Sequence, residues 1–425
     1  MSTSIFDVKE HFVNAQHIRE YPAATAERQE DVLQLALKQY VPRDNLSPKA
    51  GDFSIIGAHA NGFPKELYEP LWEEIHHRLK AQGIAIRGIW IADVAHQGKS
   101  SMVNEQKLGN DPSSLDHARD LLLMINEFRD QLPRPIVGIG HSMGAVQLIT
   151  LSLLHPRLLQ SLVLIEPPMT PIPITSYALA IATASTFRKD RWSSRDAVRA
   201  AMPKNPYYRS WDPRVFDQWI EHGFRDTPTV LHPQPGAVTL ATPKLQEVFT
   251  FLRPLYDVSR DVNKTAYPDL DPTTLAPDRT GYNAAADFVW RNLPALRPTA
   301  LYIMGGASPL GASELEAMKL ARTGMGVGGS GGAPSGKVGQ VTIPGGGHLL
   351  PMETVDGTAE AIVEWLGQQV PVVRLSDEEF QKRWDGLTLM EKSRLDDRWN
   401  EIAGAFLAKM KESKLHSTTP QTKMM

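Results

Sequence analysis

The chain has 425 residues, of which 42% are hydrophobic and 22% charged, and its formal net charge is -3. This composition is ordinary for a globular chain of roughly two or three domains, or for one large α/β domain with insertions, and it excludes a collagen-like or wholly disordered chain. Because 45 basic residues face 48 acidic ones and no long basic stretch occurs, nucleic acid is not an expected partner. The absence of cysteine excludes disulfides, thiolate metal sites and cysteine nucleophiles.

The first 170 residues alternate short β-branched runs with amphipathic stretches, a pattern typical of a mostly parallel sheet with helices on both faces. Two further strands are predicted within 10–42, as an antiparallel start to this sheet. The other expected elements are strands at 52–58, 84–91, 135–140 and 161–165 and helices at 64–82, 114–131 and 144–154.

The pattern changes at Pro167, where prolines cluster. Helical patterns then run through roughly 175–224 and 242–257, followed by a Pro- and Asp-rich stretch at 268–278. The α/β pattern resumes with strands at 299–305 and 337–344 and a helix at 355–370. We therefore predict an α/β core at 1–167 and 291–375, interrupted by an inserted, largely helical cap at 168–290.

The C-terminal part is charged and helical in pattern. Residues 376–412 predict a helical extension whose apolar stripe would pack on the body or form a homodimer contact, and 413–425 predict a disordered tail. No apolar stretch of 18 residues and no secretory signal occur, so we expect an intracellular protein without a membrane span.

Gly140-His141-Ser142-Met143-Gly144 fits the pattern G-x-S-x-G where a predicted strand meets a predicted helix. In that context the motif indicates a nucleophile elbow, in which a strained backbone lifts the serine hydroxyl above the carboxyl edge of the sheet. We therefore assign Ser142 as the nucleophile, the alternative being a structural tight turn. His141 is expected to point elsewhere.

A serine hydroxyl needs a neighbouring base to take its proton. His348 follows three glycines at the end of the last predicted strand, at the same sheet edge as Ser142. We assign His348 as this base, the alternative being an ordinary loop residue.

The acid partner of the histidine has two candidate positions. Glu166 directly follows the strand at 161–165, from where it would hold the Nδ1–H of His348. The strand at 299–305 has no carboxylate after it until Glu314. We assign Glu166, with Glu314 or another acid as the alternative, or a site without a third member.

An oxyanion hole needs two backbone N–H groups aimed at the developing negative charge. One is assigned to Met143, which follows the nucleophile. The loop His59-Ala60-Asn61-Gly62-Phe63-Pro64 should supply the other, and Phe63 is our choice because Asn-Gly-Phe-Pro stands where many hydrolases have His-Gly-x-Pro. His59 is interpreted as a residue that braces the loop.

No cofactor or metal is expected. The run from Gly331 to Lys337 nearly matches a phosphate-binding loop, but Val338 replaces the required hydroxyl and the run precedes a strand instead of a helix. Asp93 and His96 lack the companion ligands of a metal site and are interpreted as loop residues.

Together these residues resemble the α/β-hydrolase superfamily, over about residues 50 to 370. The His-Ala-Asn-Gly-Phe-Pro loop, the Gly-His-Ser-Met-Gly elbow and the Leu-Ile-Glu-Pro acid are similar to fungal secondary-metabolite acyl-CoA hydrolases. That group includes the acyl-CoA thioesterase of mycophenolic acid biosynthesis and related toxin-pathway thiohydrolases. The resemblance implies an acid after the sixth strand, cleavage of a CoA thioester of a large apolar acid, a homodimer and a peroxisomal location.

We therefore expect a serine hydrolase, of acyl-CoA thioesterase type, that acts on a small-molecule acyl-CoA or ester substrate. The alternatives are a carboxylester or lactone hydrolase with the same triad, and a catalytically silent binding module. Candidate acyl-pocket residues are Tyr177, Phe187, Trp192 and Trp211, and candidate partners of the CoA phosphates are Arg188, Lys189 and Arg191.

The location has two candidates, the peroxisome by resemblance and the cytosol. Ser413-Lys414-Leu415 spells a peroxisomal tripeptide, but its receptor reads a free C-terminus. The last three residues printed, Lys423-Met424-Met425, do not match that signal.

Overall fold

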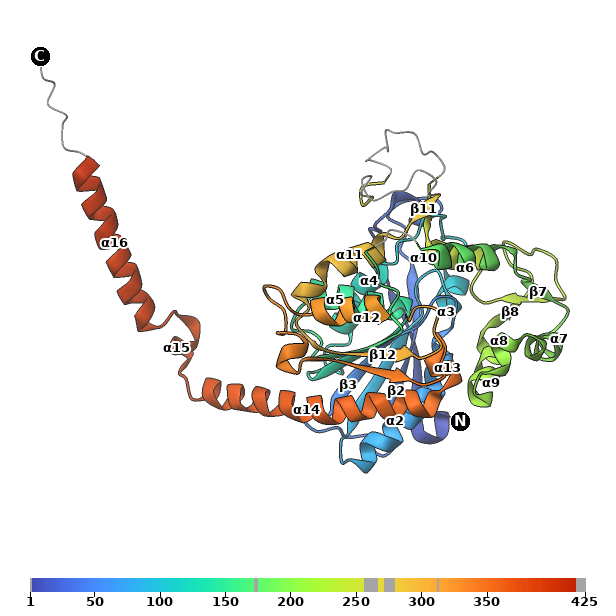
Figure 1. Ribbon diagram of the computed structural model, residues 1–425, viewed down its shortest axis with the longest axis horizontal. Helices are drawn as coiled ribbons and strands as arrows, with labels where there is room; N and C mark the ends of the chain where they lie inside the picture. Colours follow the sequence, from blue (N-terminus) through green and yellow to red (C-terminus); the bar gives the residue numbers. More distant parts are fainter. Residues whose placement is uncertain (1, 172–174, 256–266, 271–279, 312, 418–425) are drawn as a thin grey trace, which may run out of the picture. The chain divides into compact units, whose positions relative to one another are not determined.

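The structure, a computed structural model, describes residues 2–171, 175–255, 267–270, 280–311 and 313–417. The chain divides into two compact units, residues 1–370 and 371–425. The first unit holds the sheet and the inserted segment, and the described part of the second is mainly helical (Figure 1).

The first unit is built on an eight-stranded sheet with the order β1-β2-β4-β3-β5-β6-β12-β13. Strand β2 pairs antiparallel with both β1 and β4, and the remaining neighbours are parallel, as the sequence predicted. The strands are β1 (Phe6–Asn14), β2 (Gln34–Pro42), β3 (Phe53–Ala58), β4 (Ile86–Ala92), β5 (Ile136–His141), β6 (Ser161–Ile165), β12 (Thr299–Gly305) and β13 (Val338–Ile343).

Helices cover both faces of this sheet because successive strand residues point to opposite sides. Ile55 belongs to one buried apolar cluster, with helices α2 (Glu69–Ala81) and α14 (Val355–Asp385). Its neighbour Ile56 belongs to the other, with α4 (Asp116–Glu127), α5 (Met143–Leu154) and α11 (Ala284–Asn292). The sheet is therefore buried on both faces, and only its edges are open to carry a site.

The inserted segment lies between β6 and β12, and its green part stands outside the sheet in Figure 1. It is largely helical but also contains the small antiparallel sheet β7-β9-β8 and the pair β10-β11. Its last helix, α11, packs against α5 of the core. The helices are α6 (Ser176–Phe187), α7 (Arg195–Ala201), α8 (Pro206–Arg209), α9 (Pro213–His222) and α10 (Lys244–Phe251), and the strands are β7 (Arg191–Trp192), β8 (Phe224–Asp226), β9 (Val238–Leu240), β10 (Arg253–Pro254) and β11 (Gly281–Tyr282).

The first unit also contains the helices α1 (Ser2–Ile5), α3 (Gly98–Val103), α12 (Ser313–Arg322) and α13 (Leu350–Glu353). Helix α14 continues past the predicted end at 370 through Pro371, and α15 (Leu389–Ser393) and α16 (Asp397–Ser417) follow. Residues 413–417, predicted to be disordered, are therefore helical, and 418–425 lie outside the described residues. None of the described helices combines the length and the apolar character needed to cross a membrane.

Candidate active site

Ser142 lies at the turn between β5 and α5, with φ 52° and ψ -116°. A non-glycine residue with positive φ is strained, and this strain turns the side chain away from the sheet. The turn fits only because its flanking residues are small: a Cβ on Gly144 would lie 2.1 Å from the carbonyl oxygen of Ala58, and a Cβ on Gly140 would lie 2.7 Å from the nitrogen of Ala145. The predicted elbow is thus present in the fold.

The three residues predicted as a triad lie in hydrogen-bond contact. Ser142 Oγ is 3.0 Å from Nε2 of His348, and Nδ1 of His348 is 3.1 Å from Oε2 of Glu166. This arrangement orients the imidazole with its Nδ1–H toward the carboxylate and its Nε2 toward the hydroxyl. Glu314, the alternative acid, is exposed on α12.

The backbone fixes Glu166 at the end of β6. Its N–H donates to the carbonyl of Ile303 at 2.9 Å, and it adopts φ 52°, the only other non-glycine residue besides Ser142 with positive φ among the residues described. Its fully buried carboxylate accepts the N–H of Gly305 and the hydroxyl of Ser308, each at 2.5 Å. Three donors, including His348, therefore hold this carboxylate, as a buried charge requires.

His141 contacts the site, although the sequence analysis had it pointing elsewhere. Its Nε2 lies 2.9 Å from the carbonyl oxygen of His348, and its Nδ1 lies 2.9 Å from the hydroxyl of Tyr68, which accepts the N–H of Ala60. Burial, followed by the nearby His348, lowers the pKa of His141 to about 3, so its ring is neutral. A carbonyl only accepts, so the neutral ring donates from Nε2 and accepts from Tyr68 at Nδ1. His141 thereby joins the loop after β3 to the loop that carries His348.

The prediction of Phe63 as an oxyanion-hole donor is wrong. The N–H of Phe63 closes a turn on the carbonyl of Ala60 at 3.2 Å, and its ring packs on Trp211 and Trp219 in the cap. Asn61 instead lines the pocket beside Ser142 and Met143, and its N–H has no acceptor among the described residues. No signal in the sequence separates Asn61 from Phe63, because both lie in the loop that follows β3.

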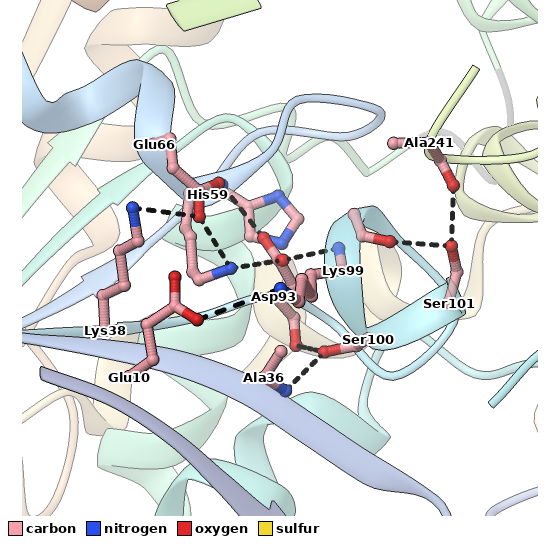
Figure 2. A network of polar contacts seen from close by, with 12 residues as sticks. Glu10, Ala36, Lys38, His59, Glu66, Asp93, Lys99, Ser100, Ser101 and Ala241 are labelled. Atoms are coloured by element: carbon pink, nitrogen blue, oxygen red, sulfur yellow. Dashed lines mark hydrogen bonds and ion pairs between the residues drawn. The ribbon is translucent and has the colours of Figure 1, made fainter. Parts of the chain in front are cut away.

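A network of polar contacts joins the loop after β3, which carries His59 and Asn61, to the loop after β4, which carries Asp93 (Figure 2). The carboxylate of Asp93 accepts the Lys65 N–H at 2.9 Å, the Lys65 ammonium at 2.8 Å and the Lys99 N–H at 2.8 Å. His59 donates from Nδ1 to the carbonyl of Ala60 and accepts the N–H of Val94 at Nε2. The carboxylate of Asp93 therefore has three hydrogen-bond donors within the protein. The described part of the chain contains no group of three His, Asp or Glu residues that could hold a metal ion.

A pocket of about 910 Å³, measured with its open mouth, lies above Ser142 and His348. Its lining is mainly apolar and comes from the core, from α6, α10 and α11 of the inserted segment, and from α12. Tyr177 lines it, as predicted. Apolar lining residues include Val146, Met169, Ile181, Phe251, Leu310 and Leu315.

The other predicted cap residues do not line this pocket. Trp192 and Trp211 are buried in the core of the inserted segment, where their rings pack against Phe224 and Trp219 respectively. Phe187 is exposed at the end of α6.

The predicted phosphate partners are only partly available. Arg188 forms an ion pair with the buried Glu247, and Lys189 lies over the ring of Trp192. Arg191, in β7, is exposed.

Three features define the class of this protein: the nucleophile elbow, the histidine that follows the last strand, and the mostly parallel sheet with a segment inserted between β6 and β12. A family model described as "Alpha/beta hydrolase family" matches residues 55–362, and the chain belongs to that family of hydrolases.

Among curated proteins, the chain is 39% identical to "Type I acyl-CoA thioesterase mpaH'" of Penicillium brevicompactum, over 95% of this chain and 96% of the relative. It is 38% identical to "Type I acyl-CoA thioesterase mpaH" of Penicillium roqueforti, over the same shares. Among solved structures it is similar to the peroxisomal alpha-beta-hydrolase Lpx1 of Saccharomyces cerevisiae, with a TM-score of 0.67 and 18% identity, over 98% of this chain and 99% of that one. This last likeness concerns the fold.

Proposed function

We propose that this protein is a serine hydrolase that cleaves acyl-CoA thioesters of a large apolar acid, of the fungal secondary-metabolite type, through an acyl-Ser142 intermediate. The observation that carries the proposal is the hydrogen-bond path from Ser142 through His348 to the buried Glu166, below an apolar pocket. The two Penicillium relatives, named acyl-CoA thioesterases, support the thioester as the substrate class.

In the acylation step, Oγ of Ser142 attacks the thioester carbonyl carbon while Nε2 of His348 takes the hydroxyl proton. The buried carboxylate of Glu166 stabilises the imidazolium that forms and fixes the ring orientation. His348 then protonates the departing CoA sulfur, which leaves the acyl group on Ser142.

In the deacylation step, His348 takes a proton from water, the resulting hydroxide attacks the acyl ester, and the proton returns to Oγ of Ser142. The free acid leaves and the enzyme is restored. In both steps the tetrahedral oxyanion accepts the backbone N–H groups of Met143 and Asn61, because Met143 begins α5 with an unpaired N–H and Asn61 lies across the pocket.

The side chain of Asn61 keeps this donor in place. Its Nδ2 donates to the carbonyl of Glu247 at 2.9 Å, and its Oδ1 accepts from Gln97 at 2.6 Å. The side chain is therefore occupied on both ends, and the backbone N–H is the group that remains for substrate. Removing one such donor typically costs about 100- to 1,000-fold in kcat.

The proposal is tested by comparing octanoyl-CoA with p-nitrophenyl octanoate on the wild-type protein and on Ser142→Ala. We expect a higher kcat/KM for the thioester and no turnover of either by Ser142→Ala. A higher kcat/KM for the oxygen ester would replace the thioesterase by a carboxylester hydrolase. No turnover of either substrate by the wild type would favour a binding module. The homodimer and the peroxisomal or cytosolic location stay predictions from the resemblance.

A further inference from the structure

The pocket contains one charged group that the hydrolytic mechanism does not use, Lys319 of α12. Its side chain lines the pocket with Ser142 and His348 and is only 2% exposed. The ammonium donates to the backbone carbonyl of Pro167 at 3.0 Å. An ammonium carries three N–H donors, so this contact leaves two of them for other acceptors.

No carboxylate in the described part of the chain lies within ion-pair distance of the Lys319 ammonium. The two carboxylates whose charges act on Lys319 are hydrogen-bonded to other groups. Glu166 binds His348, Gly305 and Ser308, and Glu316 accepts from the side chain of Gln340 at 3.0 Å. Burial lowers the pKa of Lys319 to about 8, and Glu166 and Glu316 oppose this only in part. The lysine is nevertheless mainly charged at neutral pH.

The other buried lysines of the described chain are paired. Lys65 contacts Asp93 and Glu66 at 2.8 and 3.0 Å, and Lys38 contacts Glu69 and Glu66 at 3.1 and 3.4 Å. A buried charge without a counter-ion is costly, and proteins normally avoid it by such pairing. Lys319 differs from both in facing a pocket open to a ligand.

We propose that Lys319 recognises a carboxylate on the acyl group, so that the preferred substrates are thioesters of acids bearing a second acidic group. This inference rests on the proposed function, since it places the acyl chain in this pocket. The substrate carboxylate supplies the counter-ion that the protein lacks, and the apolar lining holds the intervening carbon chain. Tyr177 lines the same pocket, and its hydroxyl can donate to the same substrate carboxylate.

The test measures kcat/KM for CoA monothioesters of unbranched diacids with 4 to about 12 carbons against the matched monoacyl-CoAs. We expect the wild type to prefer the diacid at one or more chain lengths by at least about tenfold, and Lys319→Met to lose that preference. Lys319→Arg, which keeps the charge, should retain part of it. The matched control Lys204→Met removes an exposed lysine of the cap and should leave the preference unchanged.

If Lys319 had a purely structural role through its bond to Pro167, Lys319→Met would lower kcat/KM for both substrates of a pair by the same factor. That result, or a wild type without preference at any length, would overturn the proposal.

The same comparison with p-nitrophenyl half-esters separates this inference from the thioesterase proposal. If oxygen esters are cleaved better, the thioesterase proposal fails, while a diacid preference that depends on Lys319 still supports the inference. Calorimetric binding of free octanedioate to the wild type and to Lys319→Met gives a readout without turnover. Equal affinities of the wild type and Lys319→Met for octanedioate would contradict the proposal.

Discussion

The buried charged groups at the carboxyl edge of the sheet and in the wall of the pocket differ in how many polar partners they have within the protein. At the edge, Glu166 and Asp93 each have three donors, and Lys65 has two carboxylates. In the pocket, the Lys319 ammonium has one carbonyl acceptor and no carboxylate partner among the described residues. The difference separates two tasks: a fully paired edge holds reacting groups in one geometry, and an incompletely paired wall leaves interactions for the substrate.

The largest effect is expected from breaking the paired edge at Glu166. Replacing Glu166 by Ala removes the group that orients His348 and stabilises its imidazolium, and we expect kcat to fall about 10⁴-fold. Steady-state kinetics with octanoyl-CoA measures this, with Glu314→Ala as the control that should behave like wild type. Near-native turnover by Glu166→Ala would show that the third member is not needed.

The second prediction compares the two lysines by stability. Although burial alone would lower it, Asp93 and Glu66 raise the pKa of Lys65. Lys65→Met leaves Asp93 buried with one cation fewer, so we expect the free energy of unfolding to fall by about 3 to 5 kcal/mol. Urea denaturation measures this loss, and a change below about 1 kcal/mol would mean that the pairing contributes little.

Lys319→Met should instead raise the free energy of unfolding, because it removes a buried charge that has no carboxylate partner among the described residues. The fall of the Lys319 pKa from 10.5 to about 8 corresponds to about 3 kcal/mol of destabilisation of the wild type at neutral pH. The lost bond to Pro167 offsets about 1 kcal/mol of the gain. We therefore expect Lys319→Met to be the more stable protein at pH 7.

The pH dependence of that difference has a definite sign. Between about pH 8 and 10.5 the unfolded wild-type chain binds a proton at Lys319 that the folded chain lacks, so wild-type stability rises with pH relative to the variant. The advantage of Lys319→Met is thus full below pH 8 and lost as the pH approaches 10.5. Denaturation curves of both proteins across this range check it, and an advantage that stays constant with pH would contradict it.

The last prediction concerns His141, a positioning residue. His141→Phe removes the bond to the carbonyl of His348, and we expect kcat to fall about 10- to 100-fold with little change in KM, which corresponds to about 1 to 3 kcal/mol. Tyr68→Phe, which leaves that bond intact, should lose less. An equal loss in both variants, or a loss in KM alone, would argue against positioning of the histidine loop.

The sequence predicted the paired edge better than the wall. The sheet and the elbow follow from local patterns, because the period of two in strands and the small residues around Ser142 are dictated by the backbone. The sequence predicted that Glu166 and His348 lie together because parallel strands place their carboxyl ends at one edge, so a position just after a strand implies a position in space.

The wall was predicted poorly because its residues converge from several helices and loops that are far apart in the sequence. Trp192 and Trp211 were chosen as pocket residues by their chemistry alone, and they form the core of the cap instead. Lys319 stands in an ordinary helical pattern, where a lysine normally indicates an exposed position. Only the packing of α12 against the core makes it a pocket residue.

The central claim is that Ser142 is made nucleophilic by His348. Mass spectrometry after treatment with a fluorophosphonate tests it most directly, with wild type, His348→Ala and Ser142→Ala in parallel. We predict one adduct on the peptide containing Ser142 in the wild type, a strongly slowed adduct in His348→Ala and none in Ser142→Ala. An adduct on another residue, or equal labelling of wild type and His348→Ala, would contradict the account.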